Sequence, residues 1–237
     1  MADFDGAGVL VTGGSRGIGR ATCELFAARG ARVVVHYASN ESAARDVVDG
    51  LAGEGHACVR ADLGAGEARG LAEAARSVLG CIDVLVNNAG VYEPHPVLGT
   101  SADEWAASWS RTLATNLIGP ADLIHAVAPH MVEAGGGRIV NVTSRGAFRG
   151  EPDHAAYGAS KAALNSLSQS MAKALAPHHV YVTAVAPGFV ETDMASPYLN
   201  GPAGEEIKAQ SPMDRAATPE EIARVIVFLA TPGAEST

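Results

Sequence analysis

Short apolar runs rich in β-branched residues alternate along this chain with longer segments that repeat apolar residues at helical spacing. Residues 32–36, Arg-Val-Val-Val-His, are a clear short run, and residues 16–28 are a typical longer segment. Such alternation is typical of βαβ units, in which helices cover a parallel sheet. We therefore expect an α/β fold: one domain, residues 1–237, with a doubly wound parallel sheet of six strands and helices on both faces.

The same pattern places the individual elements. Strands are expected at residues 8–12, 32–36, 56–60, 83–86, 138–142 and 181–185. Helices are expected at residues 16–28, 41–52, 67–79, 102–132, 155–176 and 219–229. Thr218 is a favourable N-cap for the last helix, with Pro219 at its first position. Gly119-Pro120 should bend the long helix at residues 102–132, because proline removes a helical hydrogen bond.

Composition excludes several classes of protein. A net charge of −9 argues against nucleic acid or an anionic membrane surface as a partner. No apolar run approaches the roughly 20 residues of a membrane helix, and no signal peptide precedes the first strand. Cys23, Cys58 and Cys81 are scattered, which is typical of reduced thiols in a cytoplasmic protein. The histidines have no ligand spacing, so no metal site is expected.

Between the first expected strand and its helix lies a glycine-rich turn at residues 12–19, Thr-Gly-Gly-Ser-Arg-Gly-Ile-Gly. Glycines there permit a tight turn and let the backbone approach a pyrophosphate, while the helix N-terminus offers free N–H groups to the anion. A purely structural turn is the alternative reading. The strand–turn–helix context favours the dinucleotide loop of a Rossmann-type domain.

The spacing T-G-x-x-x-G-x-G is followed in order by Asn87-Asn88-Ala89-Gly90, by Tyr157 and Lys161, and by Pro187-Gly188. With these motifs the chain resembles the classical short-chain dehydrogenase/reductase family, from Val9 to about Leu229. Its general look is nearest to that of 3-oxoacyl-[acyl-carrier-protein] reductases. The cofactor contacts that the loop and the resemblance imply are Gly13, Ser15, Arg16, Gly17, Ile18, Gly19, His36, Tyr37, Ser39, Asn40, Asp62, Leu63, Asn88, Ala89, Gly90, Tyr157, Lys161, Pro187, Gly188, Val190 and Thr192.

The end of the second strand indicates NADP(H) rather than NAD(H). An acidic residue there usually reads the two ribose hydroxyls of NAD, but this chain has His36 and Tyr37. Arg16 in the glycine loop supplies a cation for a 2′-phosphate, and Ser39 and Asn40 supply neutral hydrogen bonds. The alternative is that Arg16 is only a solvated surface cation.

Tyr157 and Lys161 are four residues apart on one expected helix, so their side chains should share a face. Hydride delivery to a ketone creates an alkoxide that needs a proton, and a phenol is a suitable donor. A nearby ammonium and an oxidised nicotinamide should both lower the phenol's pKa from its ordinary value near 10. The alternative is that the two residues share a helix face without any catalytic role.

Two further residues complete the predicted catalytic set. Ser144, thirteen residues before Tyr157, is placed to hold the substrate oxygen, with Thr143 as its competitor. By resemblance, Asn116 would hold a water that links Lys161 to bulk solvent. Taken singly, a buried asparagine or serine is more often a satisfied polar group of the core.

The segment after Ser144 carries unusually many charges. Arg145 and Arg149 would bind an anionic or phosphopantetheine-linked substrate, or would pair with Glu151 and Asp153. We favour the ion pairs, because surface charge pairs are common.

Residues 191–211 contain Pro197, Gly201, Pro202 and Gly204, as expected of a mobile substrate lid. By resemblance, a seventh strand would follow residues 219–229, but the chain stops where that strand should begin. Either the sequence is truncated there or the sheet edge is finished differently, and a missing edge strand would expose backbone hydrogen-bonding groups. The resemblance also implies a homotetramer, or a dimer.

The motifs together predict an NADP(H)-dependent oxidoreductase that transfers hydride between nicotinamide and a carbonyl or secondary alcohol. Its partner is a small-molecule substrate, and a ketoreductase of 3-oxoacyl type is the favoured reading. A sugar, polyol or steroid alcohol dehydrogenase is the alternative within enzymes. From another class, a non-catalytic NADP(H)-binding sensor or scaffold is the competitor, but it would be expected to lack Tyr157 or Lys161.

Overall fold

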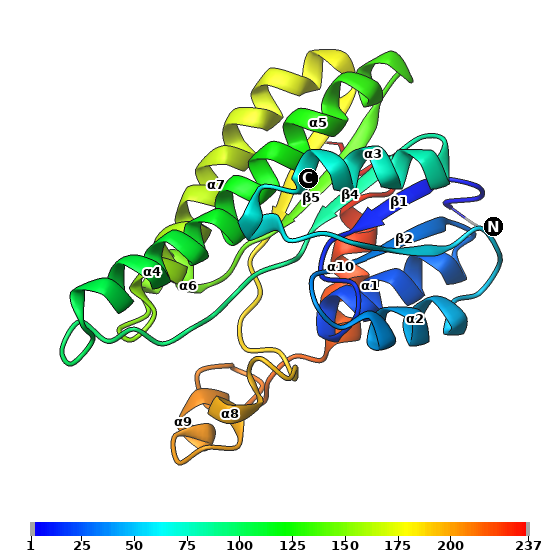
Figure 1. Ribbon diagram of the computed structural model, residues 1–237. Coiled ribbons are helices and arrows are strands. Elements are labelled where there is room, and N and C mark those ends of the chain that lie inside the picture. The colour runs from blue at the N-terminus through cyan, green and yellow to red at the C-terminus, as the bar shows by residue number, and fades with distance from the viewer. Residues whose placement is uncertain (1–2, 236–237) are drawn as a thin grey trace.

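The computed structural model describes residues 3–235, and these residues form one six-stranded sheet in the order β3-β2-β1-β4-β5-β6 (Figure 1). All paired strands run parallel. The strands are β1 (Gly8–Val11), β2 (Arg32–Tyr37), β3 (Ala57–Arg60), β4 (Val84–Asn87), β5 (Gly137–Val142) and β6 (Val180–Val185). The predicted α/β class, the doubly wound sheet and its six strands are therefore confirmed, with each strand end within one residue of its predicted place.

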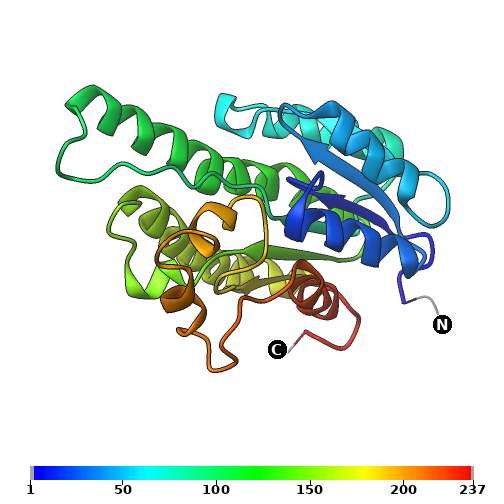
Figure 2. The same cartoon turned by 90° about the horizontal axis from the view of Figure 1, so that it is seen from below.

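Helices cover both faces of the sheet (Figure 2). One layer consists of α1 (Gly17–Ala28), α2 (Glu41–Gly50) and α10 (Pro219–Leu229), and the other of α3 (Ala68–Leu79), α5 (Gly119–Glu133) and α7 (Ala155–Leu175). Successive strand residues point to opposite faces, so Val9 and Val11 pack in one core and Leu10 in the other. Burial on both faces explains why the strands read as continuous apolar runs rather than as alternating ones.

The long predicted helix at residues 102–132 is interrupted. It consists of α4 (Ala102–Leu113), a π-helical segment Ala114–Ile118, and α5. The irregularity thus comes directly before Gly119-Pro120, where a bend was expected. Pro120 has no N–H to donate to the carbonyl of Asn116, which weakens regular α-helical bonding at this point. The segment buries Asn116 completely.

The start of the last helix was predicted, whereas three short helices were not. Thr218 caps α10 in a capping box with Glu221, as its sequence indicated. The short helices α6 (Gly146–Arg149), α8 (Ser196–Leu199) and α9 (Gly204–Lys208) have too few residues to show a helical repeat. In Figure 1 the lobe with α8 and α9 (orange) projects beyond the sheet.

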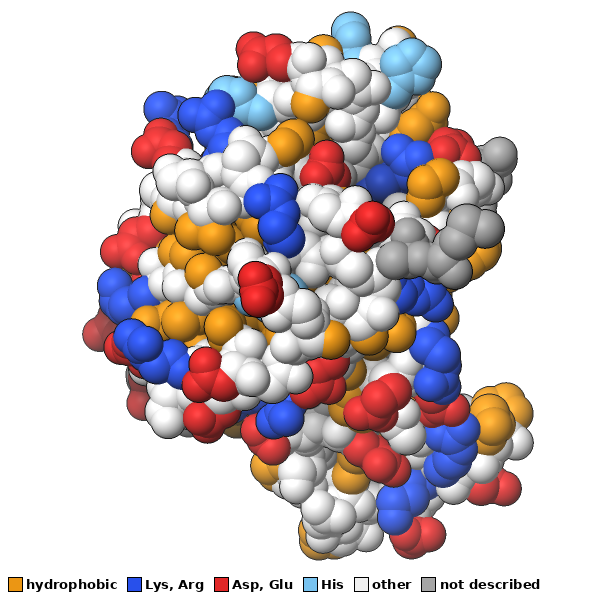
Figure 3. Space-filling model, turned by 90° about the vertical axis from the view of Figure 1, so that its right-hand side faces the viewer, with side chains coloured by type: hydrophobic (Ala, Val, Ile, Leu, Met, Phe, Trp, Pro, Cys, Tyr) orange, Lys and Arg blue, Asp and Glu red, His pale blue; other side chains and the backbone are white. Residues whose placement is uncertain are grey.

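The surface is polar and mixed in charge. Figure 3 shows acidic and basic side chains interspersed over one face of the molecule. Within the described residues no helix combines the length and apolar character needed to cross a bilayer.

Phe26 offers a test of the packing between α1 and the sheet. It is fully buried and meets Phe4 edge-on, with ring centroids 4.9 Å apart. We expect Phe26→Ala to lower the free energy of unfolding by about 3–5 kcal/mol, because a cavity replaces the ring. On the same helix Arg20 pairs with Glu24 in solvent, so Arg20→Ala should cost less than about 1 kcal/mol. Urea denaturation measures both, and equal losses would contradict the packing described.

Candidate active site

A cleft of about 670 Å³ opens where the strands end, on the side of the glycine turn. In open parallel sheets ligands bind at this edge, where the strand order reverses between β1 and β4. Of the predicted site residues only Gly19 and Asn116 do not line the cleft, and both lie behind its wall. Those that line it are Gly13, Ser15, Arg16, Gly17, Ile18, His36, Tyr37, Ser39, Asn40, Asp62, Leu63, Asn88, Ala89, Gly90, Ser144, Tyr157, Lys161, Pro187, Gly188, Val190 and Thr192.

The glycine turn has the backbone that its sequence requires. Gly13 and Gly17 have φ of 62° and 51°, in the left-handed region that other residues rarely adopt. A Cβ on Gly19 would come within 2.1 Å of the carbonyl oxygen of Gly13. Gly19 therefore allows α1 to approach the turn closely and supports it from behind.

Thr12 and Asn88 join the glycine turn to the loop after β4. The Thr12 hydroxyl accepts hydrogen bonds from the backbone N–H groups of Asn88 and Ala89, both at 2.9 Å. The Asn88 amide donates to the carbonyls of Thr12 and Gly13 at 2.9 and 3.1 Å. Asn88 thus positions the two cofactor loops against each other, and Thr12, although part of the sequence motif, was not predicted to do so.

His36 lines the cleft but its ring is already bonded. Its Nδ1 accepts from the backbone N–H of Gly13 at 3.0 Å, and its Nε2 lies 3.0 Å from the carbonyl of Ala61, to which it donates in the neutral tautomer. Burial lowers the pKa of His36, which favours that neutral form. The ring therefore holds the glycine turn on β2, and both its nitrogens are occupied.

Arg16 lies exposed at the N-terminus of α1 and forms no ion pair with the described residues. Tyr37, Ser39 and Asn40 line the same end of the cleft. The amide oxygen of Asn40 accepts from the N–H of Ala43 at 3.0 Å and so caps α2. This end of the cleft therefore has one uncommitted cation and no carboxylate at the end of β2.

Tyr157 and Lys161 lie in the first turns of α7, one turn apart and facing the cleft. The Lys161 ammonium donates to the carbonyl of Val142 at 2.8 Å and lies 5.8 Å from the centre of the Tyr157 ring. Ser144, two residues beyond β5, accepts from the N–H of Gly146 at 3.1 Å and also hydrogen-bonds Tyr157. The structure thus brings the three predicted groups together.

Burial controls the titration of this pair. It lowers the pKa of the Lys161 ammonium from 10.5 to about 8. Burial also raises the pKa of the Tyr157 phenol, which the hydrogen bond with Ser144 partly opposes. The predicted lowering of this pKa involves an oxidised nicotinamide as well as the ammonium, so for the cofactor complex it stays a prediction.

Asn116 acts on the backbone of the neighbouring loop. Its amide oxygen accepts from the N–H of Val91 at 2.8 Å, and its amide nitrogen donates to the carbonyl of Val91 at 3.0 Å and to Ser160 at 3.2 Å. The side chain is thus fully occupied. The role of Asn116 in holding a water therefore stays a prediction.

Comparison with known proteins agrees with this geometry. Residues 7–202 match the model of the family described as short chain dehydrogenase. An uncharacterized oxidoreductase of Methylorubrum extorquens is 38% identical, over 98% of this chain and 93% of the relative. A 3-oxoacyl-[acyl-carrier-protein] reductase of Synechocystis is 39% identical, over 94% and 88% respectively. The chain belongs to the short-chain dehydrogenase family.

A solved short-chain dehydrogenase from Burkholderia cenocepacia, in complex with NADP, superposes with a TM-score of 0.88. The two chains are 30% identical, and the superposition covers 98% of this chain and 94% of the other. This short-chain dehydrogenase therefore shares both its family and its complete fold with a protein solved in a cofactor complex.

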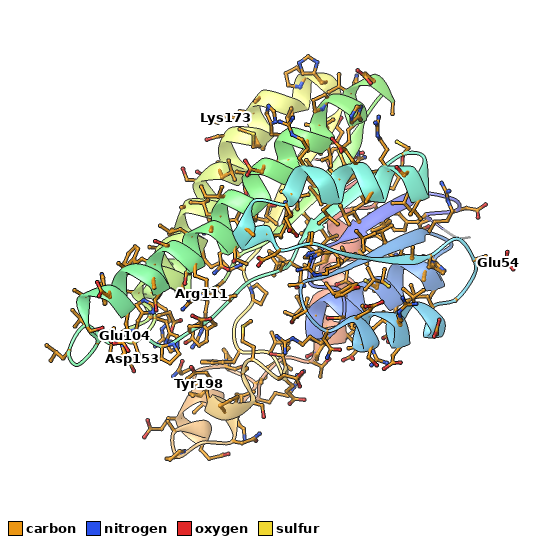
Figure 4. All side chains as sticks on the ribbon, in the orientation of Figure 1. Glu54, Glu104, Arg111, Asp153, Lys173 and Tyr198 are labelled. Carbon is orange, nitrogen blue, oxygen red and sulfur yellow. The ribbon has the colours of Figure 1, made fainter. Side chains whose placement is uncertain are left out.

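Aromatic side chains form the wall next to Tyr157 in this short-chain dehydrogenase. Tyr92 meets the Tyr157 ring edge-on at 4.7 Å and stacks flat on His154 at 3.7 Å. His154 Nε2 lies 2.9 Å from the hydroxyl of Tyr198, on α8. Figure 4 shows Tyr198 on the lobe of residues 191–211, and Asp153, the neighbour of His154, on the loop before α7. Tyr92, His154 and Tyr198 were not predicted as site residues, although Tyr92 lies only two residues after the Asn-Asn-Ala-Gly motif.

The two arginines after Ser144 do not form the expected ion pairs. Within the described residues Arg149 donates to the side-chain oxygen of Gln210 at 2.7 Å. Arg145 lies over the ring of Phe189, 4.5 Å from its centroid. The prediction that they pair with Glu151 and Asp153 was wrong, because both side chains turn toward the loop after β6 and the lobe instead.

The burial of Lys161 can be tested through the pH dependence of the protein's stability. A pKa lowered from 10.5 to about 8 corresponds to a penalty on the order of 3 kcal/mol, present at pH 7 and lost as pH rises from 8 to 10.5. Lys161→Met removes this penalty and also a hydrogen bond worth about 1 kcal/mol. We expect the variant to be about 2 kcal/mol more stable than the native protein at pH 7.

Urea denaturation at pH 7, 8, 9.5 and 10.5 measures this effect. The native protein should gain stability relative to the variant over this range, because its unfolded state binds the extra proton there. A variant less stable than the native protein at pH 7, or a difference that does not change with pH, would refute the assigned burial.

Proposed function

We propose that this chain is an NADP(H)-dependent ketoreductase of 3-oxoacyl type, which transfers hydride between nicotinamide and a carbonyl or secondary alcohol carbon. The observation that carries the proposal is the meeting of three groups in the cleft: the Tyr157 phenol, the Ser144 hydroxyl and the Lys161 ammonium. A proton donor, a hydrogen-bond partner and a cation are the parts that reduction of a carbonyl requires. The likeness to the Synechocystis reductase supports the 3-oxoacyl substrate.

The cleft fits a dinucleotide on its own geometry. The glycine turn leads into the N-terminus of α1, whose free N–H groups suit a pyrophosphate. Asp62 and Leu63 would hold the adenine, Gly90 a ribose, and Arg16 the 2′-phosphate, which needs an uncommitted cation. The cofactor supplies the hydride, and the NADP complex of the Burkholderia relative supports this choice of cofactor.

In ketone reduction the roles of the protein's own groups follow from their positions. Ser144 hydrogen-bonds the carbonyl oxygen and directs it to Tyr157, whose phenol donates the proton to that oxygen. The phenolate that remains is stabilised by Lys161, and the same groups act in reverse when an alcohol is oxidised. Lys161 keeps its charge at neutral pH, because its pKa remains at about 8.

The proposal also includes a substrate lid. Residues 191–211 serve as the lid: Asp193, Met194, Ala195 and Tyr198 from this segment line the cleft, and Tyr198 contacts His154.

A non-catalytic NADP(H)-binding protein is disfavoured because Tyr157 and Lys161 are both in place. The homotetramer or dimer and the cytoplasmic location remain predictions.

Tyr157→Phe tests the catalytic role. Only the hydroxyl is removed, so we expect native folding and NADPH affinity but a loss of roughly 100-fold or more in turnover. NADPH oxidation with acetoacetyl thioesters, diketones, quinones and sugar ketones measures the rate, and NADPH fluorescence measures binding. Turnover within a few-fold of the native rate would reject the assignment.

Arg16→Ala tests the choice of cofactor. Removal of a charge-assisted contact with the 2′-phosphate should weaken NADPH binding by about tenfold or more and leave NADH binding nearly unchanged. Arg20→Ala, on the same helix but already paired with Glu24, is the matched control. A native protein that binds both cofactors equally, or equal losses in the two variants, would contradict this role.

A further inference from the structure

The substrate end of the cleft contains an arginine, Arg145, whose side chain is held in a defined position. Its backbone N–H donates to the carbonyl of Pro187 at 3.0 Å, which ties the end of β5 to the loop after β6. Its Cδ lies 3.8 Å from where a Cβ on Gly188 would be, and its guanidinium carbon lies 4.5 Å from the centroid of Phe189. The stem therefore crosses the loop after β6, and stacking holds the guanidinium there.

No acidic side chain of the described residues pairs with this guanidinium. Glu151 also lines the cleft, but it accepts from the hydroxyl of Tyr92 at 3.4 Å and lies beyond ion-pair distance of Arg145. Partial burial and the nearby charge of Arg149 lower the pKa of Arg145, and the Glu151 carboxylate opposes this shift from a distance, yet a guanidinium remains charged at neutral pH. A partly desolvated cation without a direct ion pair gains from an anion that hydrogen-bonds it.

The other cations of the cleft are already assigned. Lys161 donates to Val142 and contacts the catalytic tyrosine, and Arg16 lies at the opposite end, beside Tyr37. Arg149 donates to Gln210 outside the cleft lining. Arg145 directly follows Ser144, which the proposed function assigns to the reacting oxygen, so an anion at Arg145 would belong to the substrate.

We propose that Arg145 binds a carboxylate of the substrate, and that the preferred substrates are oxo acids, ketones that carry a free carboxylate. The inference rests on the carbonyl reduction of the proposed function, and it names free oxo acids rather than 3-oxoacyl thioesters as the preferred substrate class. A planar guanidinium suits a carboxylate because it donates two parallel hydrogen bonds. The rings of Tyr92, Phe189 and Tyr198 provide the apolar wall along which the carbon chain between the two groups lies.

The test compares each acid with its neutral methyl ester: acetoacetate, 4-oxopentanoate and 5-oxohexanoate, which place the carboxylate at three distances from the ketone. The native enzyme should reduce at least one acid with a kcat/KM about tenfold or more above that of its ester. In Arg145→Met, which keeps the stem on Phe189, the KM of that acid should rise by about tenfold or more, and by much more than the ester's.

Two controls make the result specific. Arg149→Gln removes the neighbouring charge and should keep the preference for the acid, and Arg145→Lys should restore only part of it, because an ammonium lacks the planar fork. NADPH affinity and thermal unfolding of each variant separate a substrate effect from loss of cofactor or fold.

The outcomes separate the inference from the function on which it rests. Esters reduced as well as acids at every length, or equal losses for both in Arg145→Met, would overturn the role of Arg145 and leave the reductase intact. A fall in NADPH affinity that accounts for the whole effect would overturn it as well. Failure of the native protein to reduce any ketone would overturn the proposed function, and the inference with it.

Discussion

The pairing of β1 with β2 on one side and β4 on the other determines where everything else lies. All three strands run parallel, so their carboxyl ends share one edge, and the connections from β1 and β4 leave toward opposite faces. A crevice therefore opens between those connections, and the backbone topology alone creates it. The glycine turn after β1 and the Asn-Asn-Ala-Gly segment after β4 consequently face each other, and a cofactor laid across them meets α7 at its far end.

Hydrogen bonds between buried polar side chains hold this arrangement in register. Thr12 and Asn88 link the two cofactor loops, and Asn116 holds the next part of the second loop through Val91. Behind them, Asn87 donates to Asn141 at 2.8 Å, and Asn141 donates to a serine of α7 at 2.8 Å. In a dry interior such bonds are directional and costly to break, so they position loops more exactly than apolar packing does.

Charge in the site is set by burial more than by neighbouring charges. The Lys161 ammonium reaches a pKa of about 8 because it is desolvated and is offered one carbonyl oxygen and no carboxylate. The same desolvation raises the pKa of Tyr157, so in the protein alone the phenol keeps its proton and is ready to donate it. Arg145 is likewise a cation without a carboxylate partner among the described residues.

The sequence by itself determined the α/β class, the strands and the glycine turn, because these depend on local periodicity and on backbone requirements such as the left-handed turn at Gly13. Most of the predicted cleft residues followed from the family resemblance. Only the tertiary structure decided how side chains distant in the chain meet. The Arg145 guanidinium stacks on Phe189 instead of pairing with Glu151, and the Asn116 side chain hydrogen-bonds the backbone of Val91. His154 stacks on Tyr92 and contacts the hydroxyl of Tyr198. These outcomes depend on which groups the loops bring within a few ångströms, and no spacing along a chain encodes that distance.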